Sequence, residues 1–199
     1  MPKIITTFVF LFLACTTLAQ VGVGTTSPVG KLTVDASADT TAALELVPQP
    51  TPTTNLAAGQ IAVIGDKAYM YDVSRSKWLS LEILPIEFGF SGARDNVYLR
   101  SAGNVNNANS GPIMPYNGTI VAVTANSNNG STTKEFEVRV RNGTTTNSTQ
   151  SYNLVNREFL ENNTNLDFDA GDFLKVFIND DTTGDVNNLN VVLFVKWRQ

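Results

Sequence analysis

The chain contains no histidine, and its single cysteine, Cys15, lies in an N-terminal leader. The absence of histidine excludes Ser-His-Asp and Cys-His catalytic arrangements, as well as zinc sites that depend on histidine. The absence of a second cysteine excludes an intramolecular disulfide, even in an oxidising compartment. Catalysis by carboxylates alone remains chemically possible. A glycosidase, however, needs two carboxylates about 5 to 9.5 Å apart in a cleft, and this distance is set by the fold and not by sequence spacing. We therefore expect the protein not to be an enzyme.

Charged residues are also scarce, at 16% of the chain, and acidic residues outnumber basic ones by 18 to 14. The resulting net charge of −4 argues against nucleic acid as a partner. Asparagine and threonine are abundant instead, with 21 and 23 residues. Thr and Val suit pleated strands, whereas Asn and Gly suit turns, so the composition predicts an all-β fold.

Residues 1–19 have the pattern of a secretory signal peptide. Lys3 precedes an apolar run, Ile4–Ala14, and small residues stand before Gln20. The apolar run is too short for a membrane span, which needs about 20 residues. We therefore expect no membrane span and a protein that is secreted or held at the surface of a bacterium.

Two interpretations of the cleavage site are open. Cleavage after Ala19, which we prefer, leaves Gln20 as the first residue and no lipid. Alternatively, Phe12–Cys15 resembles a bacterial lipobox, in which Cys15 becomes the lipidated first residue.

The remaining chain changes character three times. A short β stalk or assembly segment is followed by a Pro/Thr linker, a small β-meander and a C-terminal head. With the signal peptide, the predicted boundaries are 1–19, 20–47, 48–55, 56–84 and 85–199. Alternate prolines in the linker favour an extended spacer. A Gly65-Asp66 turn between two apolar runs predicts a hairpin in the meander.

The head shows clean strand periodicity. In Lys134–Arg141, Phe136, Val138 and Val140 share one face, while the charged residues lie on the other face, which we expect to be exposed to solvent. The charged residues of that strand are Glu135, Glu137, Arg139 and Arg141. Short strands at this spacing predict an antiparallel β-sandwich.

The last strand, Leu189–Trp197, is apolar on both faces. Its odd-numbered residues fill one face, while Val192 and Phe194 place large apolar groups on the other. A strand that is apolar on both sides is expected to be covered on both sides. Either another part of the same chain covers the second face, or Val192 and Phe194 form a subunit interface.

Several segments carry a resemblance to known families. VGVGTTSP followed by Lys31–Val34 resembles the opening module of tail-fibre-like surface proteins exported by Bacteroidota-type bacteria, and GQIAVIGDKAYMYDVSRSKWLSL is similar to small β-modules of phage tail fibres. Pro115–Val123, Phe136–Val140, the Asp169–Asp172 turn and the closing strand resemble the trimeric jelly-roll heads of phage receptor-binding and tumour-necrosis-factor-like proteins. This resemblance implies a jelly-roll head in a homotrimer that binds a partner or holds a fibre together, and it assigns no binding residue.

Few residues qualify as ligand-binding candidates. Tyr116 and Tyr152 each stand beside a polar loop, and we expect both to be exposed. Tyr69, Tyr71 and Trp78 could stack on sugars, but aromatic residues at period-2 spacing favour the core of the meander.

Two groups of aspartates raise the question of calcium, which prefers oxygen ligands from loops. The groups are Asp167, Asp169 and Asp172, and Asp180, Asp181 and Asp185. Neither has the spacing of an EF-hand, and Asp is an ordinary turn residue, so we favour turns and expect no cofactor.

The leading hypothesis is an exported, non-enzymatic, homotrimeric surface or fibre protein that attaches to a surface glycan or protein or assembles into an extracellular fibre. The alternatives are a carbohydrate-binding module and a carboxylate-dependent glycoside hydrolase.

Overall fold

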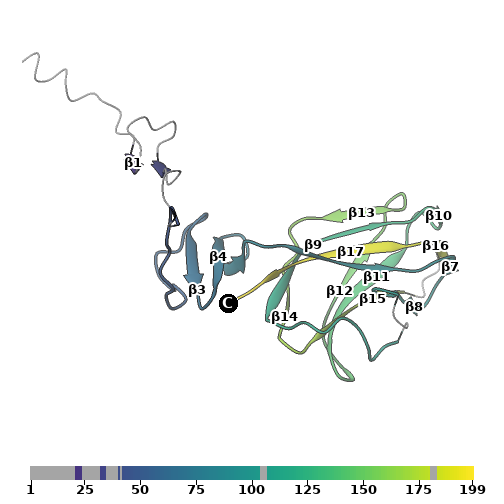
Figure 1. Cartoon of the computed structure of the whole chain (residues 1–199). Helices are drawn as coiled ribbons and strands as arrows, with labels where there is room; N and C mark the ends of the chain where they lie inside the picture. The colour runs from purple at the N-terminus through teal and green to yellow at the C-terminus, as the bar shows by residue number, and fades with distance from the viewer. Residues whose placement is uncertain (1–20, 24–31, 35–39, 41, 104–106, 180–182) are drawn as a thin grey trace, which may run out of the picture. The chain divides into compact units, whose positions relative to one another are not determined.

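The computed structural model describes residues 21–23, 32–34, 40, 42–103, 107–179 and 183–199 (Figure 1). Every regular element in these ranges is a β-strand, which confirms the predicted all-β class. The described residues include no helix with the length and apolarity that a membrane crossing requires. The chain forms two compact units, Met1–Val47 and Pro48–Gln199. The signal peptide and Cys15 lie outside the described residues.

In the first unit, β1 (Val21–Val23) pairs with β2 (Leu32–Val34) in parallel. The alternating run at 43–47 forms no strand, and its large apolar residues are exposed. Alternation alone does not make a strand where no neighbouring edge supplies hydrogen bonds. A pair of three-residue strands buries little surface and is marginal on its own.

The meander consists of β3 (Ile61–Ile64), β4 (Lys67–Asp72) and β5 (Lys77–Ser80) in one antiparallel sheet. Gly65, at the predicted hairpin turn, has a φ of 64°, a conformation that glycine adopts without strain. The sheet has a small core of its own, formed by Ala62, Ile64, Tyr69, Tyr71 and Trp78. The interpretation of the three aromatic residues as core residues is therefore confirmed.

The Pro/Thr segment lies against this meander. The backbone N–H of Gln49 donates to the carbonyl of Val63 at 2.9 Å, and the indole N–H of Trp78 donates to the carbonyl of Pro52 at 3.0 Å. Residues 49–52 are thus held along the meander rather than standing free as a spacer.

Two larger antiparallel sheets follow. The first, here the β9–β17 sheet, has the order β13-β9-β17-β6, with β14 also paired to β9. Its strands are β6 (Leu84–Gly89), β9 (Gly118–Asn126), β13 (Glu158–Glu161), β14 (Leu166–Phe168) and β17 (Asn190–Trp197). The second, the β11–β15 sheet, has the order β12-β11-β15-β8. Its strands are β8 (Val97–Tyr98), β11 (Glu135–Asn142), β12 (Thr145–Asn153) and β15 (Phe173–Ile178). A small sheet joins β7 (Ala93–Arg94), β10 (Asn129–Gly130) and β16 (Val186–Asn187).

The two larger sheets share one core. The β9–β17 sheet contributes residues such as Ile120, Val123 and Leu193, and the β11–β15 sheet contributes Phe136 and Val138; all five are fully buried. This confirms the predicted inward face of the strand at 134–141. The odd-numbered face of the last strand also lies in this core, with Trp197 packed at its margin.

The opposite face of β11 differs from the prediction. Arg141 was expected to face solvent but is only 8% exposed, and the side chains of Glu137 and Arg139 are mostly buried as an ion pair at 2.5 Å. Tyr98 and residues 109–111 lie over this face, where Tyr98 and Asn109 accept hydrogen bonds from arginines. Because these covering residues come from distant parts of the chain, the alternation within β11 could not reveal them.

The sequence pattern also missed two strand segments. It marked neither residues 145–149, at the start of β12, nor β13 as strand. Both strands lie at a sheet edge, where one partner and a polar outer face suffice. Residues 145–149 therefore pair with β11 although they lack apolar alternation.

Candidate functional site

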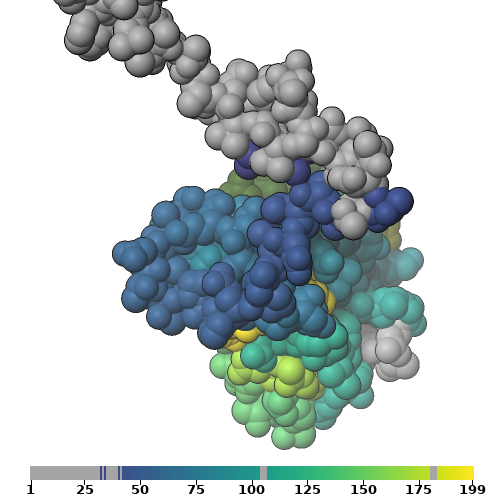
Figure 2. All heavy atoms as spheres, turned by 60° about the vertical axis from the view of Figure 1, so that its left-hand side comes forward, coloured from purple at the N-terminus to yellow at the C-terminus, as the bar shows by residue number. Residues whose placement is uncertain are grey.

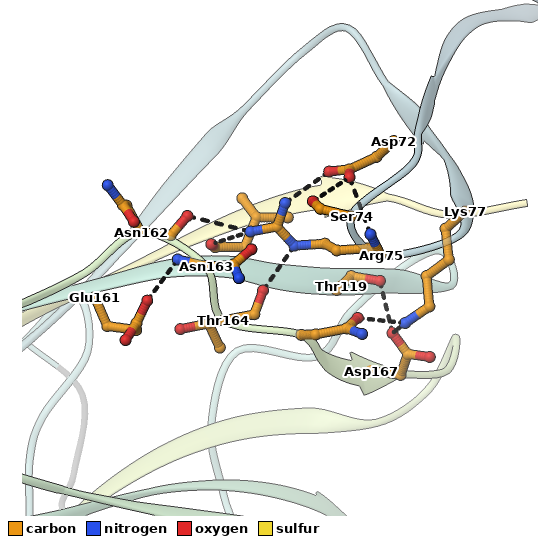
Figure 3. A network of polar contacts seen from close by, with 12 residues as sticks. Asp72, Ser74, Arg75, Lys77, Thr119, Glu161, Asn162, Asn163, Thr164 and Asp167 are labelled. Atoms are coloured by element: carbon orange, nitrogen blue, oxygen red, sulfur yellow. Dashed lines mark hydrogen bonds and ion pairs between the residues drawn. The ribbon is translucent and has the colours of Figure 1, made fainter. Parts of the chain in front are cut away.

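The meander is fastened to the β9–β17 sheet by a buried arginine (Figure 3). Arg75, at the turn between β4 and β5, has a side chain that is 9% exposed. Its Nε donates to the carbonyl of Thr164 at 2.7 Å, and one Nη2 contact reaches the carbonyl of Val121 at 2.8 Å. Its Nη1 forms an ion pair with Asp72 at 2.6 Å. We call this set of contacts the Arg75 latch.

A second ion pair lies beside the latch (Figure 3). Lys77 Nζ is 2.6 Å from a carboxylate oxygen of Asp167, which also accepts the hydroxyl of Thr119 at 2.7 Å. Burial raises the pKa of Asp167, but the hydrogen bonds from Lys77 and Thr119 outweigh it and hold the pKa below its usual value. Figure 2 shows the meander, in blue, packed directly against the teal and yellow-green atoms of the head.

The first group of aspartates is occupied by donors of the protein itself. Asp169 pairs with Arg198 at 2.9 Å. Asp172 accepts hydrogen bonds from Asn142 and Asn147, each at 3.1 Å. Together with the contacts of Asp167, these pairings favour the turn interpretation over a calcium site.

The second group is only partly described. Asp185 is exposed, and Asp180 and Asp181 lie outside the described residues. Among the residues that the structure describes, no group of three or more Asp, Glu, Cys or His side chains is placed to hold a metal ion.

Tyr116, a predicted ligand contact, is 49% exposed and lines a hollow of about 310 Å³ between the meander and the head strands. Lys67 Nζ lies 4.1 Å from the centre of its ring, and Trp197 meets the ring in an edge contact at 5.4 Å. Part of the ring is therefore already covered by residues of the same chain, while Asn117 and Tyr69 add polar groups to the hollow.

The expectation that Tyr152 is exposed is wrong. Tyr152 is 6% exposed and packs in an aromatic cluster with Phe136 and Phe159. Its hydroxyl lies 3.4 Å from that of Thr164. The polar loops beside Tyr152 suggested an exposed side chain, but position 152 on β12 faces the core.

The outer face of the β9–β17 sheet carries apolar side chains at its centre, where the exposed Glu87 and the half-buried Thr124 stand opposite Val192. Val192 and Phe194 point away from the core and both remain partly exposed. Phe194 stands opposite Pro85 and Ala122 in the neighbouring strands. Leu160, on β13, is 71% exposed. Small and large apolar groups from four strands thus lie on one face.

One feature was not predicted. Lys175, on β15, is only 2% exposed, and its Nζ donates to the carbonyl of Ser110 at 2.5 Å. Burial, followed by repulsion from Arg141, lowers the pKa of Lys175 to about 8. The only sequence signal is a lysine between Leu174 and Val176, in a strand that is otherwise apolar.

No protein-family model matches this chain, and no curated protein matches it in sequence.

Proposed function

We propose that the chain is an exported, non-enzymatic surface or fibre protein that assembles as a homotrimer through the outer face of the β9–β17 sheet. Its head is a jelly roll, and its role is attachment to a surface receptor or assembly of an extracellular fibre. The observation that carries the proposal is the partly exposed, apolar pair Val192 and Phe194 at the centre of that face.

The strand order supports the jelly roll. Along the chain, β6, β9, β13 and β17 belong to one sheet, and β8, β11, β12 and β15 belong to the other. The chain crosses between the sheets after most strands, which is how a jelly roll places its long connections. Two layers, each with a path of four strands, then lie over one core, and β14 extends the first layer by pairing with β9 along the same edge as β13.

The composition of the outer face supports self-association. A threefold axis near β17 brings three copies of Phe194 together, so that each copy covers the apolar residues of the next. Burial of such a side chain stabilises an assembly by about 1.5 to 3 kcal/mol per copy. Phe194 lies opposite Ala122 in the β-ladder, and the small side chain of Ala122 leaves space beside the Phe194 ring for an apolar group of another copy.

A second candidate, a carbohydrate-binding module, is favoured by the hollow at Tyr116, where an aromatic ring meets amide and hydroxyl groups. A glycan array of the parent protein distinguishes this role from a purely structural one. For the hydrolase alternative, the lowered pKa of Asp167 opposes a role of this one carboxyl as general acid.

Light scattering coupled to size-exclusion chromatography tests the assembly. We expect the parent to be trimeric at micromolar concentration and Phe194→Glu to be monomeric, because three carboxylates in one apolar seam repel one another and lose their hydration. Val192→Glu should act in the same way. Ile113→Glu alters a side chain that is 68% exposed beside β15 and should remain trimeric. A monomeric parent would refute the proposal.

A further inference from the structure

Lys175 is a buried cation for which the described residues supply no anion. It projects from the β11–β15 sheet on the side away from the core, between Leu174 and Val176, which are core residues. Its Nζ has one hydrogen bond, to the Ser110 carbonyl, and lies 5.1 Å from the centre of the Tyr98 ring. An ammonium group carries three donors, so this partner leaves capacity for another acceptor.

A second cation increases the local excess of positive charge. Arg141 is 8% exposed, and its Nε is buried without a hydrogen-bond partner. Its remaining contacts are to the neutral groups of Thr144, Asn109 and Tyr98. Arg139, the neighbour of Lys175 on β11, has Glu137 as its counterion, whereas the described residues provide no carboxylate within ion-pair distance of Arg141 or Lys175.

A cavity opens beside this lysine. It has a volume of about 150 Å³. Its lining consists of Lys175, the small residues Ser101, Ser110 and Gly111, and the apolar residues Phe88, Ala102 and Pro112. Gly111 is required here, because a Cβ at this position would lie 2.6 Å from the carbonyl of Leu174 and 3.0 Å from the Lys175 side chain. The close approach of residues 110–112 to β15 thus forms one wall of the cavity.

We propose that this cavity binds a small oxyanion group, such as a carboxylate or a sulfate, with Lys175 as its charged contact. Burial of a charge without a counterion is costly, and an apolar side chain at position 175 would avoid that cost. A bound oxyanion offsets it by accepting from Nζ. Arg141 adds a second positive charge nearby and favours any anion in the cavity.

The size of the cavity limits the ligand. Pockets for whole drug-sized molecules hold about 300 to 1,000 Å³, so this cavity accepts a single charged group rather than a complete oligosaccharide. The oxyanion is therefore either a free inorganic ion or the acidic group of a larger molecule whose remainder lies outside. An acidic sugar at a cell surface would supply such a group, and this source would extend the proposed attachment role.

Isothermal titration calorimetry of the full chain tests the site with two probes, sodium sulfate and sodium glucuronate, at a constant ionic strength set with sodium chloride. We expect saturable binding in the parent and at least a tenfold weaker affinity in Lys175→Met, which keeps the length of the side chain but removes the charge. Ser101→Leu fills the cavity while keeping the lysine and should lose binding as well. Arg94→Met removes an exposed arginine on β7 and should bind like the parent.

The two probes separate the two sources. Binding of sulfate alone supports a free inorganic oxyanion, whereas binding of glucuronate supports an acidic sugar. The proposal is overturned if neither probe saturates the parent below about 10 mM, or if both cavity variants bind like the parent. Light scattering of the same samples reports the oligomeric state separately, so a failure of this site is distinct from a failure of the trimer.

Discussion

Replacement of Arg75 by alanine should release the meander from the β9–β17 sheet without unfolding the head. The guanidinium group donates to three backbone carbonyls across the junction, those of Thr164 and Val121 at 2.7 and 2.8 Å and that of Asn162 at 3.2 Å. Asp72 is the partner within the meander, and its side chain is 24% exposed, so water can solvate it after the change. The carbonyls lie in a part-buried junction and would lose their donor.

The magnitude follows from these contacts. Each hydrogen bond from a charged donor contributes about 1.5 to 3 kcal/mol, so the loss of those across the junction should destabilise docking by at least about 3 kcal/mol. This corresponds to an opening equilibrium that is about two orders of magnitude more favourable. The meander has its own small core, so it can open as a unit while the two larger sheets stay closed.

Hydrogen exchange measured by mass spectrometry follows each part separately. In Arg75→Ala, peptides from residues 61–80 should exchange about one hundredfold faster, and peptides from β11 should exchange at the parent rate. Arg100→Ala removes an exposed arginine whose guanidinium lies 5.1 Å from the centre of the Phe90 ring, and it serves as the control. Parent-like exchange in residues 61–80, or equal acceleration throughout the chain, would refute the reasoning.

Acid provides an independent check of the same latch. Burial raises the pKa of Asp72, but hydrogen bonds from Ser74 and Arg75 outweigh it and hold the pKa below 3.8. A carboxyl with a lowered pKa in the folded state stabilises the fold above its unfolded pKa, and this contribution is lost as the pH falls through the folded pKa. The exchange difference between parent and Arg75→Ala should therefore be constant near neutrality and shrink only in part below pH 3.8, because the bonds from Arg75 to the backbone carbonyls do not titrate.

Two further substitutions, each with a control, test the core. Val138→Asp places a carboxylate at a fully buried position and should lower the free energy of unfolding by about 3 kcal/mol or more, whereas Thr149→Asp, on the exposed face of β12, should lower it by less than about 0.5 kcal/mol. Equal losses in urea titrations would show that the faces of β11 are assigned wrongly. Gly118→Ala places a Cβ 2.8 Å from the carbonyl of Lys196 and against the buried ring of Phe168, so it should lower the free energy of unfolding by about 1 to 3 kcal/mol. A Cβ at Gly89 has no neighbour closer than 3.7 Å, so Gly89→Ala should leave the thermal midpoint nearly unchanged.

Local patterns predicted the parts of the fold that depend on local order. The alternation of Phe136, Val138 and Val140 placed them in the core, and the Gly65-Asp66 turn placed the hairpin of the meander. Both features follow from the two-residue period of a strand and from the conformational freedom of glycine. Neither prediction depends on which distant segments pack against these residues.

The parts that were missed depend on distant segments. Arg75 contacts carbonyls 46 to 89 residues away, and no pattern near position 75 marks them. Lys175 is buried because residues 110–112 pair with β15 and close over it. Backbone carbonyls carry no sequence signature, so an arginine or lysine that binds them looks like any exposed cation in the sequence.

The latch and the proposed trimer face meet at one irregularity of β9. The register between β17 and β9 shifts between Phe194, which faces Ala122, and Val195, which faces Ile120. Val121 is therefore the extra residue of a β-bulge, and the ladder offers no regular partner to it. Arg75 supplies the donor to its carbonyl. Because bulges redirect the side chains beside them, the meander stabilises the local geometry that sets Ala122 opposite Phe194. If the trimer forms through the outer face of the β9–β17 sheet, then Arg75→Ala should also weaken the trimer, although Arg75 is not one of the apolar residues of that face.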